Sequence, residues 1–170
     1  MRLRFRGRVW RLGDNISTDH IISGKYKFKA ISSLKDMVPY VLEEVIPNFH
    51  LKVRQGDIIV AGRNFGMGSS REHAPRLLKM VGISAVVAES FARIFFRNSI
   101  NIGLPVVTAS KIPKVSEDGD EMLVDIEEGF IVNLSKGVEE RFKPYPKEIL
   151  EVLRHGGIIE YIKKFGALPW

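Results

Sequence analysis

Three short apolar segments, separated by two stretches of helical periodicity, constrain the fold of this chain more than any other feature of its sequence. Each segment is bounded by turn-forming residues, which is typical of a buried strand. The stretches between them predict two helices, one that ends at Gly82 and one over about residues 90–100. Alternating strands and helices with short connections indicate parallel strands joined by right-handed crossovers. The three predicted strands are 57–62, Ala85–Ala88 and Leu104–Val107.

The segment before this unit predicts one more strand and one more helix. Residues 1–11 alternate apolar and basic side chains at the period of a half-buried strand, and residues 12–33 form a long polar connection. Apolar positions over Leu34–Ile46 predict a helix, which Pro39 either kinks or delays. A polar connection this long inside a small domain usually has a function.

The C-terminal part changes to an antiparallel pattern. Met122–Ile126 and Phe130–Leu134 are short alternating segments that predict a hairpin, and an amphipathic helix over 146–165 is interrupted at Gly156 and Gly157. The predicted fold class is therefore α/β. We expect one domain over residues 1–170, with a largely parallel central sheet and an antiparallel supplement.

The chain contains no cysteine, so it can form no disulfide, no thiolate zinc site and no iron–sulfur cluster of its own. No stretch approaches the ~20 consecutive apolar residues that cross a bilayer. The Arg-rich start lacks the apolar run of a signal peptide. We therefore expect a soluble, cytoplasmic protein.

The charge balance favours an anionic partner. There are 26 Lys and Arg residues against 20 Asp and Glu, a net charge of +6, which suits either nucleic acid or a small carboxylate. Arginines near the start could form a ribbon that follows phosphate groups, or simply the solvated face of a strand, and we favour the strand. They are Arg2, Arg4, Arg6, Arg8 and Arg11.

A Gly-rich loop between a predicted strand and a predicted helix is the best candidate for a ligand site. The loop begins at Asn64 and continues through Gly66, Gly68, two serines and Arg71. Its glycines allow close approach of the backbone, the helix start offers free amides, and an arginine can grip a carboxylate. The spacing is that of neither a Walker loop nor a dinucleotide-binding loop.

A purely structural interpretation of the same loop also exists. Ser69 and Glu72 are three residues apart and could form a capping box at the start of the helix. Pro75 is comfortable only in a first helical turn, so the helix either starts after Ser69 or is bent.

A second polar segment, Gly13–Gly24, is dense in short side chains that favour turns and caps. Asp19 and His20 are adjacent and could be an acid/base pair, but neighbouring side chains in an extended chain point apart. We therefore expect Asp19 either to orient a cation such as Arg71 or to brace its own loop.

Taken together, these segments resemble a known family. In order, the motifs match the small subunit of the isopropylmalate isomerase and homoaconitase family, which is similar to the swivelling fourth domain of aconitase. The resemblance covers residues 7–165 and implies a swivelling β/β/α domain. The segments that carry it are Gly13–Ile21, Gly66–Ala74, Ser90–Phe95 and Arg97–Pro105.

The resemblance implies roles for individual residues. The family moves a hydroxyl group between neighbouring carbons of a hydroxy acid by dehydration and rehydration. Ser69 corresponds to the base that removes the carbon-bound proton, with an anion stabilised by the glycine loop around Gly68 and by Arg71. Arg71 also holds a substrate carboxylate with help from the amide of Ser70, and Asp19 corresponds to an acid that positions these groups.

The basic run Lys25–Lys29 resembles the family loop that sets substrate specificity. It places Lys29 at the position of a carboxylate-binding arginine, with Lys27 and Tyr26 beside it. This chain has no Tyr-Leu-Arg-like sequence there, and lysines are point charges rather than planar forks. The loop could bind a charged distal carboxylate, or Tyr26 and Phe28 could wall an apolar pocket for an isopropyl group.

The family's cofactor is a four-iron, four-sulfur cluster that acts as a Lewis acid on the substrate hydroxyl and is held by three cysteines of the large subunit. The resemblance therefore implies that this chain binds no cofactor and is active only with a cysteine-bearing large subunit. The expected reaction interconverts 2-isopropylmalate and 3-isopropylmalate, as in leucine biosynthesis. A homoaconitase subunit and a citraconate or methylmalate hydratase subunit are alternatives.

Two functions of other classes remain open. One is an RNA-binding module, although the exposed aromatic signature of common RNA-binding domains is missing. The other is a regulatory domain that binds a small carboxylate without chemistry.

The remaining polar residues favour ordinary roles. His50 and His155 have no companions at metal-ligand spacing, so we expect no metal to bind this chain. Arg93 and Arg97 lie one turn apart on a predicted helix and face either a partner or Glu89.

Overall fold

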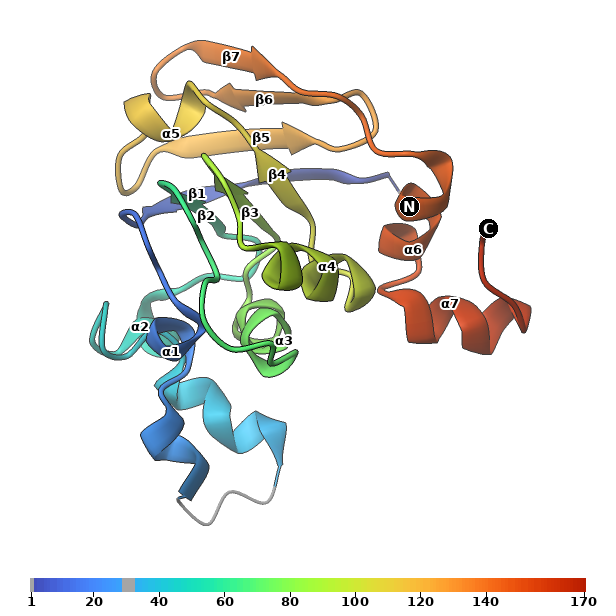
Figure 1. Cartoon of the computed structure of the whole chain (residues 1–170). Coiled ribbons are helices and arrows are strands. Elements are labelled where there is room, and N and C mark those ends of the chain that lie inside the picture. Colours follow the sequence, from blue (N-terminus) through green and yellow to red (C-terminus); the bar gives the residue numbers. More distant parts are fainter. Residues whose placement is uncertain (1, 29–32) are drawn as a thin grey trace.

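The computed structural model describes residues 2–28 and 33–170 (Figure 1). In these residues one sheet of seven strands forms, in the order β4-β3-β2-β1-β5-β6-β7. Strands β1 to β4 are parallel, and β5 to β7 continue the sheet in antiparallel pairing. The predicted α/β class is confirmed. The strands are β1 (Arg4–Arg11), β2 (Ile58–Ala61), β3 (Ala85–Ala88), β4 (Val106–Thr108), β5 (Glu121–Asp125), β6 (Phe130–Asn133) and β7 (Val138–Arg141).

Strand β1 joins the parallel and antiparallel parts because its two ends pair with different neighbours. Val9–Arg11 pairs with β2, whereas Arg4–Arg8 pairs with β5. Gly7 lies where the partners change, and a Cβ atom there would be 2.0 Å from the carbonyl oxygen of Gly56. A side chain at this position would therefore push the two parts of the sheet apart.

The two predicted crossover helices are present, and the second begins about three residues later than predicted. They are α3 (His73–Val81), which ends at Gly82 with φ of 122°, and α4 (Arg93–Asn101). Leu77 and Leu78 of α3 and Phe95 of α4 are buried, and they belong to the same hydrophobic core as the fully buried strands β2 and β3. These apolar faces form the main core.

The helix expected over Leu34–Ile46 is much shorter. The 3₁₀ helix η2 spans Leu34–Tyr40, and the chain then turns. Leu42 takes a left-handed conformation, φ 53°, and its amide donates to the carbonyl of Ile21 at 2.8 Å. A tertiary contact and burial of Leu42 thus override the helical periodicity.

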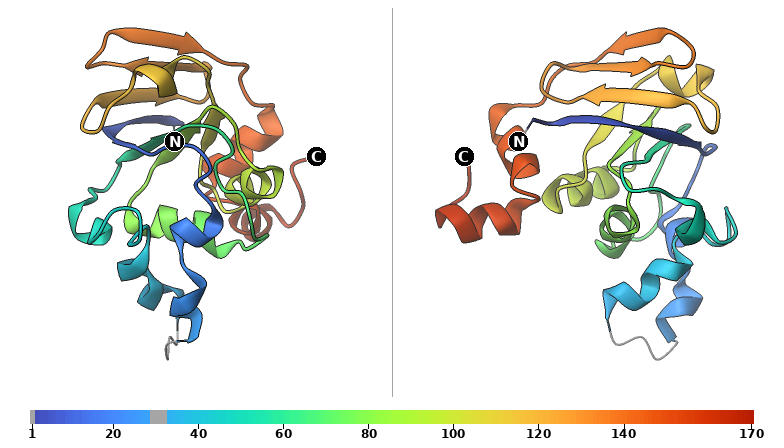
Figure 2. Two further views of the ribbon diagram at one scale, coloured as in Figure 1. Left: turned by 60° about the vertical axis from the view of Figure 1, so that its left-hand side comes forward. Right: turned by 180° about the vertical axis from the view of Figure 1, so that it is seen from behind.

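Several short elements lie within the expected connections. The polar segment 12–33 contains a single-turn helix and a 3₁₀ helix, so it is less irregular than its sequence indicates. The two elements of this segment are α1 (Thr18–Ile21) and η1 (Gly24–Phe28). Later connections contain α2 (Phe49–Lys52) and α5 (Ile112–Val115). Both views in Figure 2 place η1 and η2 at the end of the molecule opposite strands β5 to β7.

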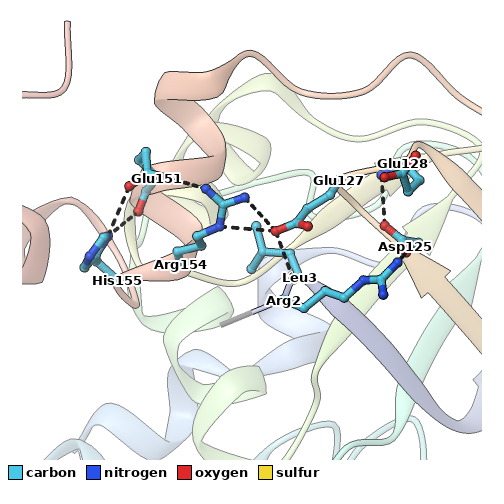
Figure 3. A network of polar contacts seen from close by, with 8 residues as sticks. All are labelled: Arg2, Leu3, Asp125, Glu127, Glu128, Glu151, Arg154 and His155. Atoms are coloured by element: carbon cyan, nitrogen blue, oxygen red, sulfur yellow. Dashed lines mark hydrogen bonds and ion pairs between the residues drawn. The ribbon is translucent and has the colours of Figure 1, made fainter.

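The predicted C-terminal helix is interrupted at the expected glycines. It consists of α6 (Lys147–Arg154) and α7 (Ile158–Phe165). Figure 3 shows how α6 is fastened to the sheet: the Arg154 guanidinium bonds Glu127, which also accepts from the amide of Leu3. Arg154 additionally pairs with Glu151, and this network lowers the pKa of Glu127, chiefly through the Arg154 hydrogen bond.

The N-terminal arginines are held by this chain's own acids and carbonyl groups. Arg4 pairs with the buried Asp125 at 3.1 Å, Arg8 with Asp57 at 3.0 Å, and the others are bonded in a similar way. This pattern supports the structural interpretation of the basic strand over a ribbon for phosphate groups. Among the described helices, none has the length and apolar character needed to cross a membrane.

Candidate active site

The two polar segments singled out by sequence lie against each other (Figure 1). The loop between β2 and α3 runs beside α1, and the amide of Gly66 donates to the carbonyl of Ile16 at 2.7 Å. The amide of Thr18 donates to the carbonyl of Met67 at 2.8 Å. Residues about fifty positions apart therefore form one surface at the carboxyl end of a parallel strand, where α/β folds place ligand sites.

The path of the loop depends on glycine at two positions. Gly66 has φ of 82°, and a Cβ atom there would lie 2.2 Å from the ring of Phe95. Gly68 has φ of 105° and faces the hydroxyl of Thr18. Glycine at these two positions lets the loop pack closely on α1 and α4, in a backbone conformation that other residues rarely adopt.

The capping box considered as an alternative for Ser69 and Glu72 is not formed, and the helix starts after Ser69, one of the two possibilities that Pro75 left. Helix α3 begins at His73, so Ser69 lies in the loop and Pro75 falls within the first turn. Glu72 instead pairs with Arg76 one turn along the helix. The amide of Ser69 donates to Thr18 Oγ1 at 3.1 Å, so the loop is held by α1 rather than by its own helix.

The side chains of Ser69, Ser70 and Arg71 have no hydrogen-bond or ion-pair partner within residues 2–28 and 33–170. Ser69 and Arg71 are half-buried, and Ser70 is exposed. The backbone at Ser70 is nevertheless fixed, because Asn98 Nδ2 donates to its carbonyl at 3.0 Å. Two hydroxyls and one guanidinium are thus presented together on a loop whose backbone is tied on both sides, as a binding site requires.

Asp19 braces its own segment, one of the two roles considered for it. Its Oδ1 atom accepts from the amide of Gly24 at 2.9 Å, which fixes the turn after α1. His20 faces Ser17 in a capping box, with Nδ1 2.9 Å from the Ser17 amide. Asp19 and His20 therefore have different partners and do not form a dyad in this structure.

Tyr26 lies in η1 and is buried to 8% exposure. Its ring stacks on Tyr40 with centroids 4.2 Å apart, which joins η1 to η2. Lys25 beside it pairs with Glu44, and that contact raises the pKa of Lys25. The side chain of Lys27 and the whole of Lys29 lie outside the described residues.

Sequence reasoning missed two residues that shape this site, Thr18 and Asn98. Each binds the backbone of the loop through its side chain, at Ser69 and Ser70 respectively. Both lie within the motifs that carry the family resemblance. Only the three-dimensional pairing of distant segments reveals their contacts, since a threonine and an asparagine carry no periodic signal.

The donor atoms of this chain do not fit an iron–sulfur cluster, because such clusters are held by cysteine thiolates and the chain has none. In the part of the chain that the structure describes, no three His, Asp or Glu side chains gather as a metal site.

The fold and the paired loops define an α/β domain with a candidate ligand site where two loops meet at the carboxyl ends of parallel strands. A sequence model of the aconitase C-terminal domain matches residues 7–111, which include both loops. The chain belongs to the aconitase C-terminal domain family.

Relatives with different names are equally similar to this chain. It is 52% identical over 164 residues to 3-isopropylmalate dehydratase small subunit 1 of Thermotoga maritima, covering 96% of this chain and 98% of the relative. It is also 52% identical over 159 residues to the methanogen homoaconitase small subunit of Methanothermobacter thermautotrophicus, covering 94% and 91%. The crystal structure of 3-isopropylmalate dehydratase from Methanocaldococcus jannaschii superimposes with a TM-score of 0.87 at 38% identity, covering 96% and 95%.

Proposed function

We propose that this chain is the small subunit of a heteromeric hydro-lyase that interconverts 2-isopropylmalate and 3-isopropylmalate. One observation carries the proposal: Ser69, Ser70 and Arg71 present side chains without partners in the described chain, on a loop tied to Thr18 and Asn98. The names of the relatives supply the reaction class, and this constellation supplies groups suited to it.

The proposed reaction needs a base and a carboxylate clamp from this chain. The ionised Ser69 Oγ takes the proton from the carbon beside a carboxylate, and the electrons of the broken C–H bond form a double bond to the neighbouring carbon. The C–O bond at that neighbouring carbon breaks, and the departing hydroxide takes a proton from solvent to become water. Re-addition of water in the opposite sense gives the isomer. Arg71 holds a carboxylate of the substrate through a two-pronged contact.

A serine hydroxyl is a weak acid, so its anion must be stabilised by nearby groups. Arg71 supplies a positive charge two residues away. The amides of Ser70 and Arg71 donate to no atom of residues 2–28 and 33–170, which leaves them available to an oxyanion. Two unbonded amides next to a guanidinium group suit this task.

The remaining half of the proposed site belongs to a large subunit. In the proposed complex, an iron–sulfur cluster on that subunit supplies a Lewis acid for the leaving hydroxyl. Because this chain has no cysteine, it contributes only the proton-transfer and carboxylate-binding groups.

Substrate choice rests on the segment around Tyr26. The buried stack of Tyr26 on Tyr40 offers an apolar wall, which favours an isopropyl group. Lys27 and Lys29 favour a second candidate, a homoaconitase subunit, since two lysines can neutralise a distal carboxylate. The homoaconitase name of an equally similar relative gives this alternative a specific basis.

The test is anaerobic purification of this chain with a cysteine-bearing large subunit from the same organism. The complex is assayed with isopropylmalate, homoaconitate and citraconate as separate substrates. We expect the highest kcat/KM with isopropylmalate. Higher values with homoaconitate would select the second candidate, and no turnover with any of the three would contradict the proposed function.

A further inference from the structure

A small hollow next to the candidate active site has a composition that the proposed reaction does not use. Its volume is about 350 Å³, and it lies where β3 and β4 end and α4 begins. It is lined by Ser90, Phe91, Arg93, Phe96, Arg97 and Thr108.

The two arginines of this hollow are available for an external partner. Arg93 and Arg97 lie one turn apart on α4, and both are exposed. Neither makes a hydrogen bond or ion pair within residues 2–28 and 33–170. The acid that sequence suggested for them, Glu89, lies 3.8 Å from Lys114 instead. The arginines of β1, by contrast, are bonded to acids or carbonyls of this chain.

The floor of the hollow is apolar and held by ring contacts. Phe91 meets Phe96 edge to face with centroids 5.8 Å apart, and it stacks on Phe95 at 6.2 Å. Phe96 in turn contacts Tyr145, whose hydroxyl is bonded to the carbonyl of Val106. Burial raises the pKa of Tyr145, so it stays a neutral donor. A fixed apolar floor beside two guanidinium groups strengthens a charged contact by excluding water.

The hollow is continuous with the active-site loop through backbone contacts. The amide of Asn64 donates to Ser90 Oγ at 2.7 Å, and the amide of Phe65 donates to the carbonyl of Ser90 at 3.0 Å. The amide of Ala92 returns a bond to the carbonyl of Phe65 at 2.9 Å. At the other end of the loop, Asn98, which follows Arg97 in α4, donates to the carbonyl of Ser70 at 3.0 Å, so the element that carries both arginines also contacts the tip of the loop.

We propose that this hollow binds a carboxylate side chain of the large subunit and positions that subunit over the Ser69 loop. The inference rests on the proposed function, which supplies the partner. An acidic residue gripped by Arg93 and Arg97 makes charge-assisted bonds of the kind enriched at interfaces. Arginine is also enriched among the few residues that contribute most of the binding energy at protein interfaces, and such residues usually lie beside well-packed apolar groups.

The experiment measures the Kd of the complex between this chain and the iron-loaded large subunit from the same organism, by anaerobic calorimetry at low and high salt. We expect Arg97→Ala to raise Kd about tenfold, and the double variant Arg93→Glu/Arg97→Glu to raise it about a hundredfold or more. The salt dependence of Kd should fall in both. Arg97→Lys should lie between Arg97→Ala and the unchanged chain.

A double charge reversal at Lys52 and Arg54 is the matched control. Both are exposed, and their side chains make no hydrogen bond or ion pair within residues 2–28 and 33–170. Lys52→Glu/Arg54→Glu therefore changes the net charge by the same amount as the double variant at Arg93 and Arg97, without breaking a contact. We expect it to leave Kd within about twofold, the size of a weak long-range charge effect. Thermal unfolding of each isolated variant verifies folding.

Two results would overturn the inference. One is an unchanged Kd in the folded Arg93→Glu/Arg97→Glu variant. The other is a raised KM for the substrate with unchanged Kd, which would assign the arginines to a small anion. Failure of the unaltered chain to bind the large subunit at all would instead contradict the proposed function itself.

Discussion

The hydroxyl of Ser69 is the group on which the proposed proton transfer depends. Its Oγ atom has no partner among the described residues, so Ser69→Ala removes the base while leaving the Ser69 amide free to bond Thr18. We expect kcat of the reconstituted complex to fall about 10²–10⁴-fold, with little change in substrate binding. Steady-state kinetics and substrate titration measure the two effects.

Ser70→Ala is the control for this prediction, because it removes a neighbouring hydroxyl that we place in binding through its backbone amide. Ser70→Ala should lower kcat by about tenfold or less. A Ser69→Ala complex with normal turnover would refute the mechanism and favour a domain that binds a carboxylate without chemistry.

Thr18 acts on the reaction through the loop rather than through the substrate. It is buried, and its Oγ1 accepts from the Ser69 amide at 3.1 Å. Thr18→Val keeps the shape but leaves that amide unbonded, which costs about 1–3 kcal/mol. We expect kcat to fall about tenfold or more with KM little changed, and Thr18→Ser to restore it. If the serine and valine variants have equal kcat, the hydroxyl has no positioning role.

The loop between β2 and α3 keeps its path because Gly66 packs onto α4. Gly66→Ala places a Cβ atom 2.2 Å from the ring of Phe95 at φ of 82°, so we expect both overpacking and backbone strain. Gly119 has nearly the same φ, 83°, with nothing within 4 Å of a Cβ atom, so Gly119→Ala carries the strain alone. Urea unfolding should show a loss of about 3 kcal/mol or more for Gly66→Ala and about 1–2 kcal/mol for Gly119→Ala. Equal losses would mean that the Phe95 contact relaxes freely.

Strand β7 is anchored by Glu140, which accepts from the amides of Ser110, Lys111 and Ile112 at 2.7–2.8 Å. Burial on its own would raise the pKa of Glu140, but these bonds outweigh it and the pKa lies below 4.5. A lowered folded pKa gives stability that is present above the unfolded pKa and lost as pH falls through the folded one.

Glu140→Gln should therefore lower the free energy of unfolding at neutral pH by about 1–3 kcal/mol. The difference in the free energy of unfolding between Glu140→Gln and the unaltered chain should shrink as pH falls below 4.5, the ordinary pKa of a glutamate. Glu139→Gln, which alters an exposed neighbour, should cost less than about 1 kcal/mol. Urea unfolding at several pH values measures both, and a difference that stays constant with pH would show that the charge of Glu140 is not responsible.

The elements that sequence predicted correctly are those whose apolar residues form either a short continuous run or a simple period. Strands β2 and β3 are continuous runs that are buried at every position, whereas helix α3 buries one face and strand β5 alternates at Met122 and Val124. Strand β7 reads Val-Glu-Glu-Arg and lies at the sheet edge, where its stability comes from Glu140 rather than from burial. Its sequence therefore carries no strand signal.

The candidate site was predictable to a similar extent. The glycines and the serine–arginine run single out this loop as a candidate anion site, because together they offer free backbone amides and a guanidinium group. Pro75 indicated that the helix could start after Ser69, but the contact between the Ser69 amide and Thr18 was not predictable. Contacts between distant segments have no local signature in a single sequence.

The molecule as a whole lacks thiolates, and this separates its folding from the proposed iron chemistry. Its core is built from apolar side chains of the sheet, α3 and α4, with α6 fastened by Arg154 and Glu127. We therefore expect the isolated chain to fold without metal and to catalyse no conversion of isopropylmalate.

Iron removal tests this separation on the complex and on the isolated chain in parallel. Treatment with a chelator and ferricyanide should abolish turnover of the complex. The melting temperature of the isolated chain should change by less than about 1 °C, because the isolated chain holds no metal whose loss would shift its folding equilibrium. Differential scanning calorimetry with iron analysis measures both. Two results would contradict the division of the active site between two chains: stoichiometric iron on the isolated chain, or a melting temperature of that chain that falls on chelation. Either result would place a metal site on this subunit.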